Sequence, residues 1–269
     1  MDEAAAENQR LWDFEVEQGC GYTVPWLDLD PDRLRAYARG ELDVLPEPFT
    51  CLYPSDVFTG VRGKQVLCLA AGGGQQSAAF GVLGAHVTVV DLTAGQLAGD
   101  RRVAAHYGYE VTTVQSDMRD LSALRDGTFD LVYQANSLAY IPDVRPLYEG
   151  VSRVLKPGGR YRVCAGQPAV HAVAWNGEAY CITQPYAADV FPRPAGVGIE
   201  FRHTMEALFN GLLDAGLTLQ RVHEAPYADR RDDRDAPPGS WTHERSYVGG
   251  EFVIIAEKRY SRRPNSDDT

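Results

Sequence analysis

The spacing of apolar residues along this chain predicts helices first and then a regular alternation of strands and helices. Residues 3–18 place Leu11 and Phe14 among charged positions, which is typical of an amphipathic helix. A second helix is predicted to begin after Asp30, because Pro31 suits the first turn of a helix and aspartate can cap it. Prolines at positions 46, 48 and 54 then indicate an extended connector into the main domain.

From residue 61 onward, short apolar runs alternate with helical patterns. The predicted strands are 66–71, 86–91, 110–115, 129–133 and, after a turn in the LKPGGR segment, 161–165. The predicted helices between them are 77–83, 94–107 and 144–155. Strands joined by helices in this way require right-handed crossovers, which build a parallel sheet covered on both faces. The pattern therefore predicts a doubly wound α/β domain.

The alternation stops after Gly166. Residues 166–200 are rich in proline and aromatic side chains, and they are too many for an ordinary connection, so we expect a lid or substrate-binding insertion. A helix over 204–215 and strands over 218–223 and 250–258 are predicted to follow. We therefore expect an N-terminal helical cover (1–60), a main domain (61–260) and a polar, disordered tail (261–269).

Composition narrows the range of partners. The 269 residues are 44% hydrophobic, enough for a full core, and the formal net charge of −11 argues against a nucleic-acid partner, which needs basic residues. The five cysteines are widely scattered without a Cys-x-x-Cys pair, so neither a disulfide framework nor a metal site is expected. There is no apolar run of membrane-spanning length and the N-terminus is acidic, so we expect a cytoplasmic protein outside the membrane.

Three consecutive glycines follow the first predicted strand in the sequence VLCLAAGGGQQS, which runs from residue 66 to residue 77. In an open α/β sheet the ligand lies beyond the carboxyl ends of the strands, and glycine lets the backbone approach it closely. Asp91 ends the next strand, where nucleotide-binding folds place an acid that binds ribose hydroxyls. The dinucleotide fingerprint would need a glycine where Ser77 stands. A nucleoside ligand is therefore predicted, and a nicotinamide dinucleotide is disfavoured but not excluded.

Five segments taken in order resemble the motifs of class I S-adenosylmethionine-dependent methyltransferases: 66–74, 86–97, 114–121, 129–143 and 151–163. The resemblance covers residues 61–165 well and the last strands loosely. It implies a Rossmann-like, mostly parallel sheet of seven strands, S-adenosylmethionine as cofactor, and methyl transfer by the domain at 61–260.

The loop after the first strand is expected to pass beneath the methionyl part of the cofactor. By the resemblance, its members are Ala70, Gly72, Gly73 and Gly74. The chain departs from the family at Cys68, where an acid is usual, and at Ala70, where a glycine is usual. A thiol cannot offset the cofactor ammonium, so carbonyl groups, water or Gln76 must hold it.

The resemblance also implies contacts with the nucleoside, from Asp91, Leu92, Gln96, Asp117 and Met118. Asp91 and Gln96 are expected at the ribose, and Leu92 and Met118 against the adenine ring. Asp117 is expected at the adenine amino group. At the end of the fourth strand, Gln134 and Asn136 are expected to face the methionyl amine. Alternatively, Asp91 caps the following helix and Asp117 is a turn residue.

Methyl transfer from a sulfonium needs mainly orientation of the acceptor, and a base only when the acceptor must lose a proton. The candidates for that base or for orienting the acceptor are His171, His203 and Tyr140; loop, cap or core positions are the alternatives. We expect methylation of O, N or C of a small organic molecule, with specialised metabolism as one setting for it. A cofactor-binding protein that transfers no methyl is the alternative, and a nicotinamide oxidoreductase comes after it.

Overall fold

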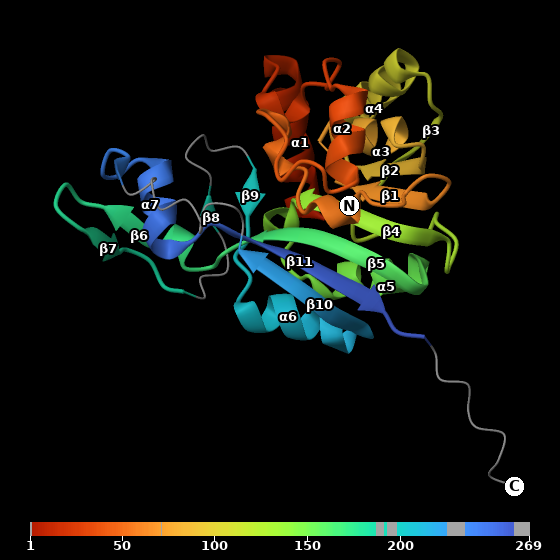
Figure 1. The fold of residues 1–269 in the computed structure, drawn as a ribbon. Helices are drawn as coiled ribbons and strands as arrows, with labels where there is room; N and C mark the ends of the chain where they lie inside the picture. Colours follow the sequence, from red (N-terminus) through yellow and green to blue (C-terminus); the bar gives the residue numbers. More distant parts are fainter. Residues whose placement is uncertain (1, 71, 187–190, 193–197, 225–234, 261–269) are drawn as a thin grey trace, which may run out of the picture.

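The computed structural model describes residues 2–70, 72–186, 191–192, 198–224 and 235–260. Its main sheet has seven strands in the order β10-β11-β5-β4-β1-β2-β3 (Figure 1). The strand bounds are β1 Gln65–Leu69, β2 His86–Asp91, β3 Val111–Gln115, β4 Phe129–Asn136, β5 Leu155–Gly166, β10 Leu217–Glu224 and β11 Glu251–Lys258. Strands β1 to β5 pair in parallel, and β11 runs antiparallel to both of its neighbours, β5 and β10. The mostly parallel, doubly wound sheet expected from the sequence is confirmed.

Strand β1 lies between β4 and β2, so the chain first winds outward from β1 to β3 and then returns to β4 on the other side. The carboxyl ends of β1 and β4 therefore border the point where the winding direction reverses. In doubly wound folds this point is a crevice that binds ligands.

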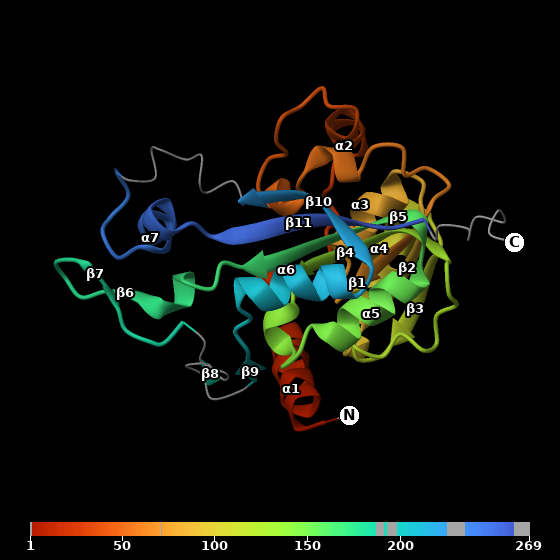
Figure 2. The ribbon, with the colours of Figure 1, turned by 90° about the horizontal axis from the view of Figure 1, so that it is seen from below.

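Helices cover both faces of the sheet (Figures 1 and 2). One face carries α2 (Pro31–Ala38), α3 (Gln76–Val82) and α4 (Ala94–Tyr107), which share a core with the sheet through Leu34, Phe80 and Val103 among others. The other face carries α5 (Arg145–Val154) and α6 (Met205–Asp214), packed through Leu147, Val151 and Leu212. Most residues of β1 and β2 are buried between the two helix layers, which explains the near-continuous apolar runs of these two strands.

The N-terminal segment packs on the domain as an integral layer. Helix α1 (Glu3–Gln18) is capped by Asp2, whose carboxylate accepts from the Ala5 N–H at 2.9 Å, and it ends at Gly19 with φ 65°. Short 3-10 turns η2 (Phe49–Cys51) and η3 (Ser55–Val57) follow α2 and reach the same core as α3. The first helix predicted from the sequence has the bounds that the structure shows.

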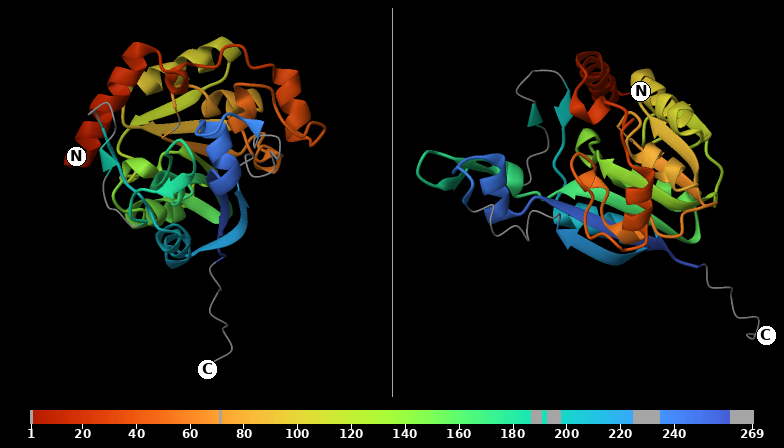
Figure 3. Two further views of the ribbon diagram at one scale, coloured as in Figure 1. Left: turned by 90° about the vertical axis from the view of Figure 1, so that its left-hand side faces the viewer. Right: turned by 45° about the horizontal axis from the view of Figure 1, so that its top comes forward.

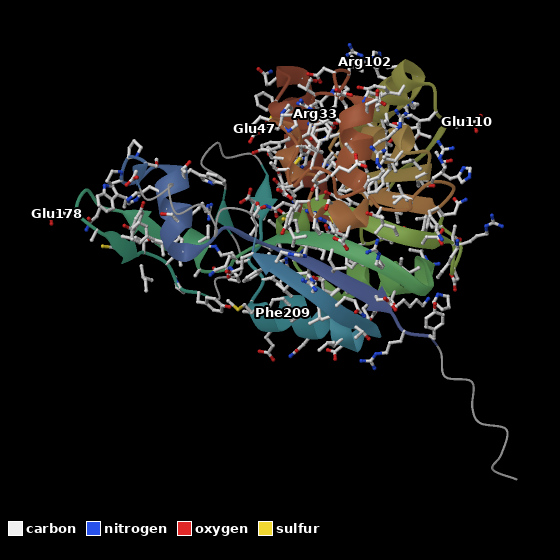
Figure 4. All side chains as sticks on the ribbon, in the orientation of Figure 1. Arg33, Glu47, Arg102, Glu110, Glu178 and Phe209 are labelled. Carbon is white, nitrogen blue, oxygen red and sulfur yellow. The ribbon has the colours of Figure 1, made fainter. Side chains whose placement is uncertain are left out.

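A smaller unit projects from one edge of the sheet (Figures 1 and 3). It consists of the hairpin β6 (Val173–Trp175) and β7 (Tyr180–Ile182) together with α7 (Trp241–Val248), and Glu178 marks the hairpin tip in Figure 4. Its rings pack together: the Tyr180 hydroxyl lies 2.6 Å from His243 Nδ1, and Tyr247 packs beside both. The separate pair β8 (Phe191–Pro192) and β9 (Ile199–Glu200) lies between this unit and α1.

Two local predictions were wrong. The turn expected in the LKPGGR segment is part of β5, which begins at Leu155 and tolerates the glycines through a register shift opposite Phe129 and Leu131. Helix α7 was not predicted, because its sequence lacks a clear apolar stripe. The tail 261–269 lies outside the described residues. Within the described part of the chain, no helix is long and apolar enough to cross a membrane.

Candidate active site

A cavity of about 580 Å³ opens at the carboxyl edge of the sheet, above the reversal point between β1 and β4. Its floor comes from the ends of β1, β2, β4, β5 and β11, and its cover comes from α1 and the segment 47–53. Glu47, labelled in Figure 4, lies on the side of the molecule that carries α1 and α2. A cavity of this size is typical of small-ligand sites.

The loop after β1 has an unusual backbone. Ala70 has φ 47°, a left-handed value that disfavours a side chain, and the three glycines that follow have φ values of 71° to 90°. Ala70 and Gly72 line the cavity, whereas Gly73 and Gly74 are not among its described lining residues. A Cβ on Gly74 would lie 2.7 Å from the carbonyl oxygen of Gly99 in α4, so this glycine permits close packing of loop and helix.

Asp91 lies where β2 ends and faces the same cavity. Its Oδ1 accepts from the Thr93 N–H at 3.0 Å, and Thr93 in turn caps α4. Asp91 is 9% exposed and lines the cavity, and the helix cap considered for it is supplied by Thr93 instead. Leu92 and Gln96 line the cavity beside it.

Asp117, on the loop after β3, lines the cavity with Met118. The Arg119 guanidinium binds the Asp117 carboxylate, with Nε 3.0 Å from Oδ1, and also binds Asp2 at the start of α1 at 2.7 Å. The hydrogen bonds from Arg119 lower the pKa of Asp2 to about 2, and both carboxylates hold the pKa of Arg119 above its usual value. This Asp2–Arg119–Asp117 chain joins the cover helix to the cavity wall.

Two buried amide oxygens in the cavity wall, Oε1 of Gln76 and Oε1 of Gln96, have no hydrogen-bond partner among the residues that the structure describes. A buried acceptor without a donor costs free energy, so such atoms are expected to bind a ligand. Cys68 is fully buried in β1, and desolvation raises its thiol pKa well above the usual value, so it stays neutral. An amide oxygen in this position can accept a hydrogen bond from an N–H or O–H group of a ligand.

The end of β4 contributes differently than the sequence suggested. Asn136 lines the cavity, and its Nδ2 donates to Glu251 Oε1 at 2.5 Å. The Gln134 side chain is fully buried on the other face, where Nε2 donates to Ser137 Oγ at 2.8 Å and Tyr161 donates to Oε1. The backbone oxygen of Gln134 accepts from Arg162 Nη1 at 2.9 Å. Its expected contact with the cofactor amine finds no support in this geometry.

The three candidates for acting on the acceptor are in different situations. Tyr140 lines the cavity and packs edge-on against Trp12 of α1, with ring centroids 5.4 Å apart. His203 is outside the described lining; its Nε2 lies 2.9 Å from the Leu138 carbonyl, and burial lowers its pKa. The backbone of His171 belongs to a 3-10 turn, but its side chain lies outside the described residues.

Most of the cavity wall over β4, β5 and β11 was not predicted from the sequence. Asn136 was expected there, but the other polar members, Arg162, Cys164 and Glu251, were not, and residues of the segment 47–53 cover them. The signal for Arg162 was present, since it is a charged residue at an inward position of an otherwise apolar strand, in the sequence RYRVCAG. No group of three His, Cys, Asp or Glu side chains in the described part of the chain is placed to bind a metal.

Comparisons with known proteins agree with this geometry. A family described as a methyltransferase domain matches residues 67–163. The chain is 30% identical over 237 residues to the uncharacterized methyltransferase YbaJ of Bacillus subtilis, covering 83% of this chain and 91% of that one. It is 33% identical over 187 residues to a ubiquinone biosynthesis O-methyltransferase of Xanthomonas oryzae, covering 67% of this chain and 66% of that one.

A solved structure of an S-adenosylmethionine-dependent methyltransferase from Mesorhizobium loti matches with TM-score 0.62 at 24% identity, covering 86% of this chain and all of that one. At that identity the match shows the fold. The family is shown by the Bacillus relative, which is 30% identical and is covered over 91% of its length. The chain belongs to the class I methyltransferases that use S-adenosylmethionine.

Proposed function

We propose that this methyltransferase transfers a methyl group from S-adenosylmethionine to O, N or C of a small organic molecule bound in the same cavity. One observation carries the proposal. A single cavity of about 580 Å³ runs from the glycine loop and Asp91 to Arg162 and Glu251, beneath the cover of α1 and the segment 47–53. A covered site suits a small acceptor better than a macromolecule. The names of the ubiquinone and demethylmenaquinone methyltransferases among the relatives are consistent with a small acceptor.

On the cofactor side, Asp91 and the orphaned oxygen of Gln96 are the proposed acceptors for the ribose hydroxyls. Leu92 and Met118 would contact the two faces of the adenine, and Asp117, held in place by Arg119, would accept from the adenine amino group. Charged acceptors form the stronger hydrogen bonds to such donors.

The methionyl end lies beside the loop of Ala70 and Gly72 in this proposal. The neutral Cys68 cannot balance an ammonium group, so the orphaned Oε1 of Gln76 takes over as an acceptor, with Asn136 on the opposite side. Gly73 and Gly74 act indirectly, because they let the loop pack tightly on α4.

When bound, the cofactor supplies a methyl carbon activated by a positively charged sulfur. The chain has to hold the acceptor in line with that carbon and to exclude water, an orientation effect that can contribute several kcal/mol. Trp12 and Tyr22 of the cover and Tyr140 of the wall enclose the cavity. The Tyr140 hydroxyl is the proposed group for orienting the acceptor. We assign no role in proton transfer to His203, because its Nε2 lies at the Leu138 carbonyl and the residue is outside the described lining.

The test is transfer of label from methyl-labelled S-adenosylmethionine to a metabolite extract, followed by size separation. We expect labelled products in the small-molecule fraction. Label confined to protein or nucleic acid would refute the small acceptor. Cofactor binding without transfer to any acceptor in a broad panel would favour a non-methylating role.

A further inference from the structure

Arg162 is a buried cation in the acceptor half of the cavity. It projects from β5 on the sheet face that carries Tyr133 and Cys164, and only 3% of its surface is exposed. The strand register places Tyr133 beside it on β4 and Ile255 beside it on β11. A charged residue in such a position is rare without a partner.

Two hydrogen bonds hold the Arg162 guanidinium in place, but they use only some of its N–H donors. Its Nε donates to the Tyr53 carbonyl at 3.0 Å, its Nη1 donates to the Gln134 carbonyl at 2.9 Å, and its centre lies 4.5 Å from the Tyr133 ring centroid. Arginine has five N–H donors, so three are unused by the described residues. Nη2 carries two of these three.

None of the described carboxylates lies within 4.0 Å of this guanidinium. Glu251 lines the same half of the cavity, but its two oxygens accept from Asn136 Nδ2 at 2.5 Å and from the Cys164 thiol at 3.1 Å. A buried charge without a counter-ion is costly, and the cost is removed when an anion binds.

We propose that the acceptor of this methyltransferase carries a carboxylate, and that Arg162 binds it through its unused N–H donors. The inference rests on the proposed function, because it specifies the substrate class of that cavity. The planar fork of arginine matches a carboxylate with two parallel hydrogen bonds. Stacking on Tyr133 and the two carbonyl bonds hold the fork in position before the acceptor arrives.

A purely structural role for Arg162 explains fewer of its contacts than anion binding does. Its bond to Tyr53 does attach the segment 47–53 to the sheet. Two carbonyl oxygens can be satisfied by neutral donors, however, and they do not explain a full charge facing a cavity. The structural role predicts loss of stability on substitution, whereas the binding role predicts loss of selectivity for anions.

The test uses the full-length protein saturated with S-adenosylhomocysteine, so that the part of the cavity beside the glycine loop and Asp91 is filled. The probes are a set of aromatic and aliphatic carboxylic acids, each paired with its primary amide of the same shape, and binding is measured by ligand-observed NMR. We expect the best acids to bind about tenfold more tightly than their amides, the effect of a charge-assisted bidentate pair. Equal binding of acids and amides by the wild-type protein would overturn the proposal, whatever the variants do.

Arg162→Gln is expected to abolish the preference for acids while leaving S-adenosylhomocysteine affinity within about twofold. Arg160→Gln is the matched control, since Arg160 lies on the same strand and pairs with Asp56 outside the cavity lining. A preference for acids that persists in Arg162→Gln would place the anion elsewhere and refute the proposal. If Arg162→Gln does not fold, Arg162→Lys serves: it keeps the charge, and the preference should fall but not vanish.

The proposed function and the inference about Arg162 are refuted by different results. If the protein does not bind S-adenosylhomocysteine, the proposed function fails. If it binds this compound but shows no preference for acids, only the inference about Arg162 fails.

Discussion

Ala70 is a residue whose backbone conformation does not suit its side chain. Its φ of 47° lies in the left-handed region, where a Cβ costs about 1–2 kcal/mol relative to glycine. Ala70→Gly should therefore raise the free energy of unfolding by about 1 kcal/mol. The relief of backbone strain stabilises the folded state, and the greater freedom of glycine in the unfolded chain offsets part of that gain. Denaturant titration measures this change in the free energy of unfolding. Gly72→Ala, at φ 75°, is the reciprocal control and should destabilise; a loss of stability in Ala70→Gly would contradict this account.

Asp91 is the residue on which cofactor binding is expected to depend most. If it binds the ribose hydroxyls, Asp91→Ala should weaken S-adenosylhomocysteine binding by about tenfold to a hundredfold, since hydrogen bonds to a charged group contribute about 1.5–3 kcal/mol. Calorimetric titration measures the affinity. Asp143→Ala, which removes a carboxylate paired with Arg145 outside the cavity lining, is the control. Unchanged affinity in Asp91→Ala would remove Asp91 from the site.

Asp100 is a fully buried carboxyl beneath the glycine loop, bonded to Ser77 Oγ at 2.5 Å. Desolvation raises its pKa from 3.8 to about 7. The folded protein therefore binds more protons than the unfolded chain between these values, and this contribution to stability falls as pH rises from 4 to 7, by up to about 1.4 kcal/mol per pH unit.

Asp100→Asn removes the ionisation, so the wild-type protein should lose stability relative to this variant over the same pH range. Denaturant titrations at pH 4.5, 5.5, 6.5 and 7.5 give the difference. A constant difference would show that Asp100 does not titrate there.

The position of Asp91 and Asp117 in the cavity wall was predictable from the sequence because both follow strand ends. Asp91 and Asp117 end or follow parallel strands, and the carboxyl ends of such strands meet at one edge. Glu251 escaped prediction because its place in the cavity wall depends on the antiparallel register of β11 with β5. Gln134 was misplaced because alternation along β4 turns its side chain to the opposite face from Tyr133.

At the scale of elements, α1 is attached to the cavity by a few polar contacts. Asp2 binds Arg119, Asn8 Nδ2 donates to the Tyr140 carbonyl at 3.0 Å, and Asn8 Oδ1 accepts from the Ile199 N–H at 2.8 Å. These contacts join the cover helix to the loop of Asp117, to the wall at Tyr140 and to β9. The contact of Asp2 with Arg119 thus attaches α1 to the part of the cavity wall that contains Asp117.

Asp2→Asn should loosen α1 while preserving its N-cap, because asparagine caps helices as well as aspartate does. The exposed ion pair contributes at most about 1 kcal/mol, so amide exchange in residues 5–16 should accelerate by up to about fivefold. Hydrogen exchange with mass spectrometry measures the rate. Glu7→Gln, which removes the exposed pair with Arg10 within the same helix, should leave exchange nearly unchanged. Equal effects of the two changes would contradict a specific role for Asp2.

For the whole molecule, the alternation of strands and helices was sufficient to predict the sheet, because right-handed crossovers leave few ways to connect parallel strands. The packing of α1 and segment 47–53 over the sheet was not predictable, and neither was the unit of β6, β7 and α7 that projects from its edge. These parts are held by contacts between residues far apart in the sequence, such as Tyr180 with His243, which no periodicity reveals.

The central claim is that the glycine loop and Asp91 bind one adenosyl group. A crystal structure with S-adenosylhomocysteine tests it most directly. We predict the methionyl part beside Ala70 and Gly72, both ribose hydroxyls within hydrogen-bonding distance of the Asp91 carboxylate, and the adenine against Met118. Ligand bound elsewhere, or an Asp91 carboxylate turned away from the ribose, would contradict the account.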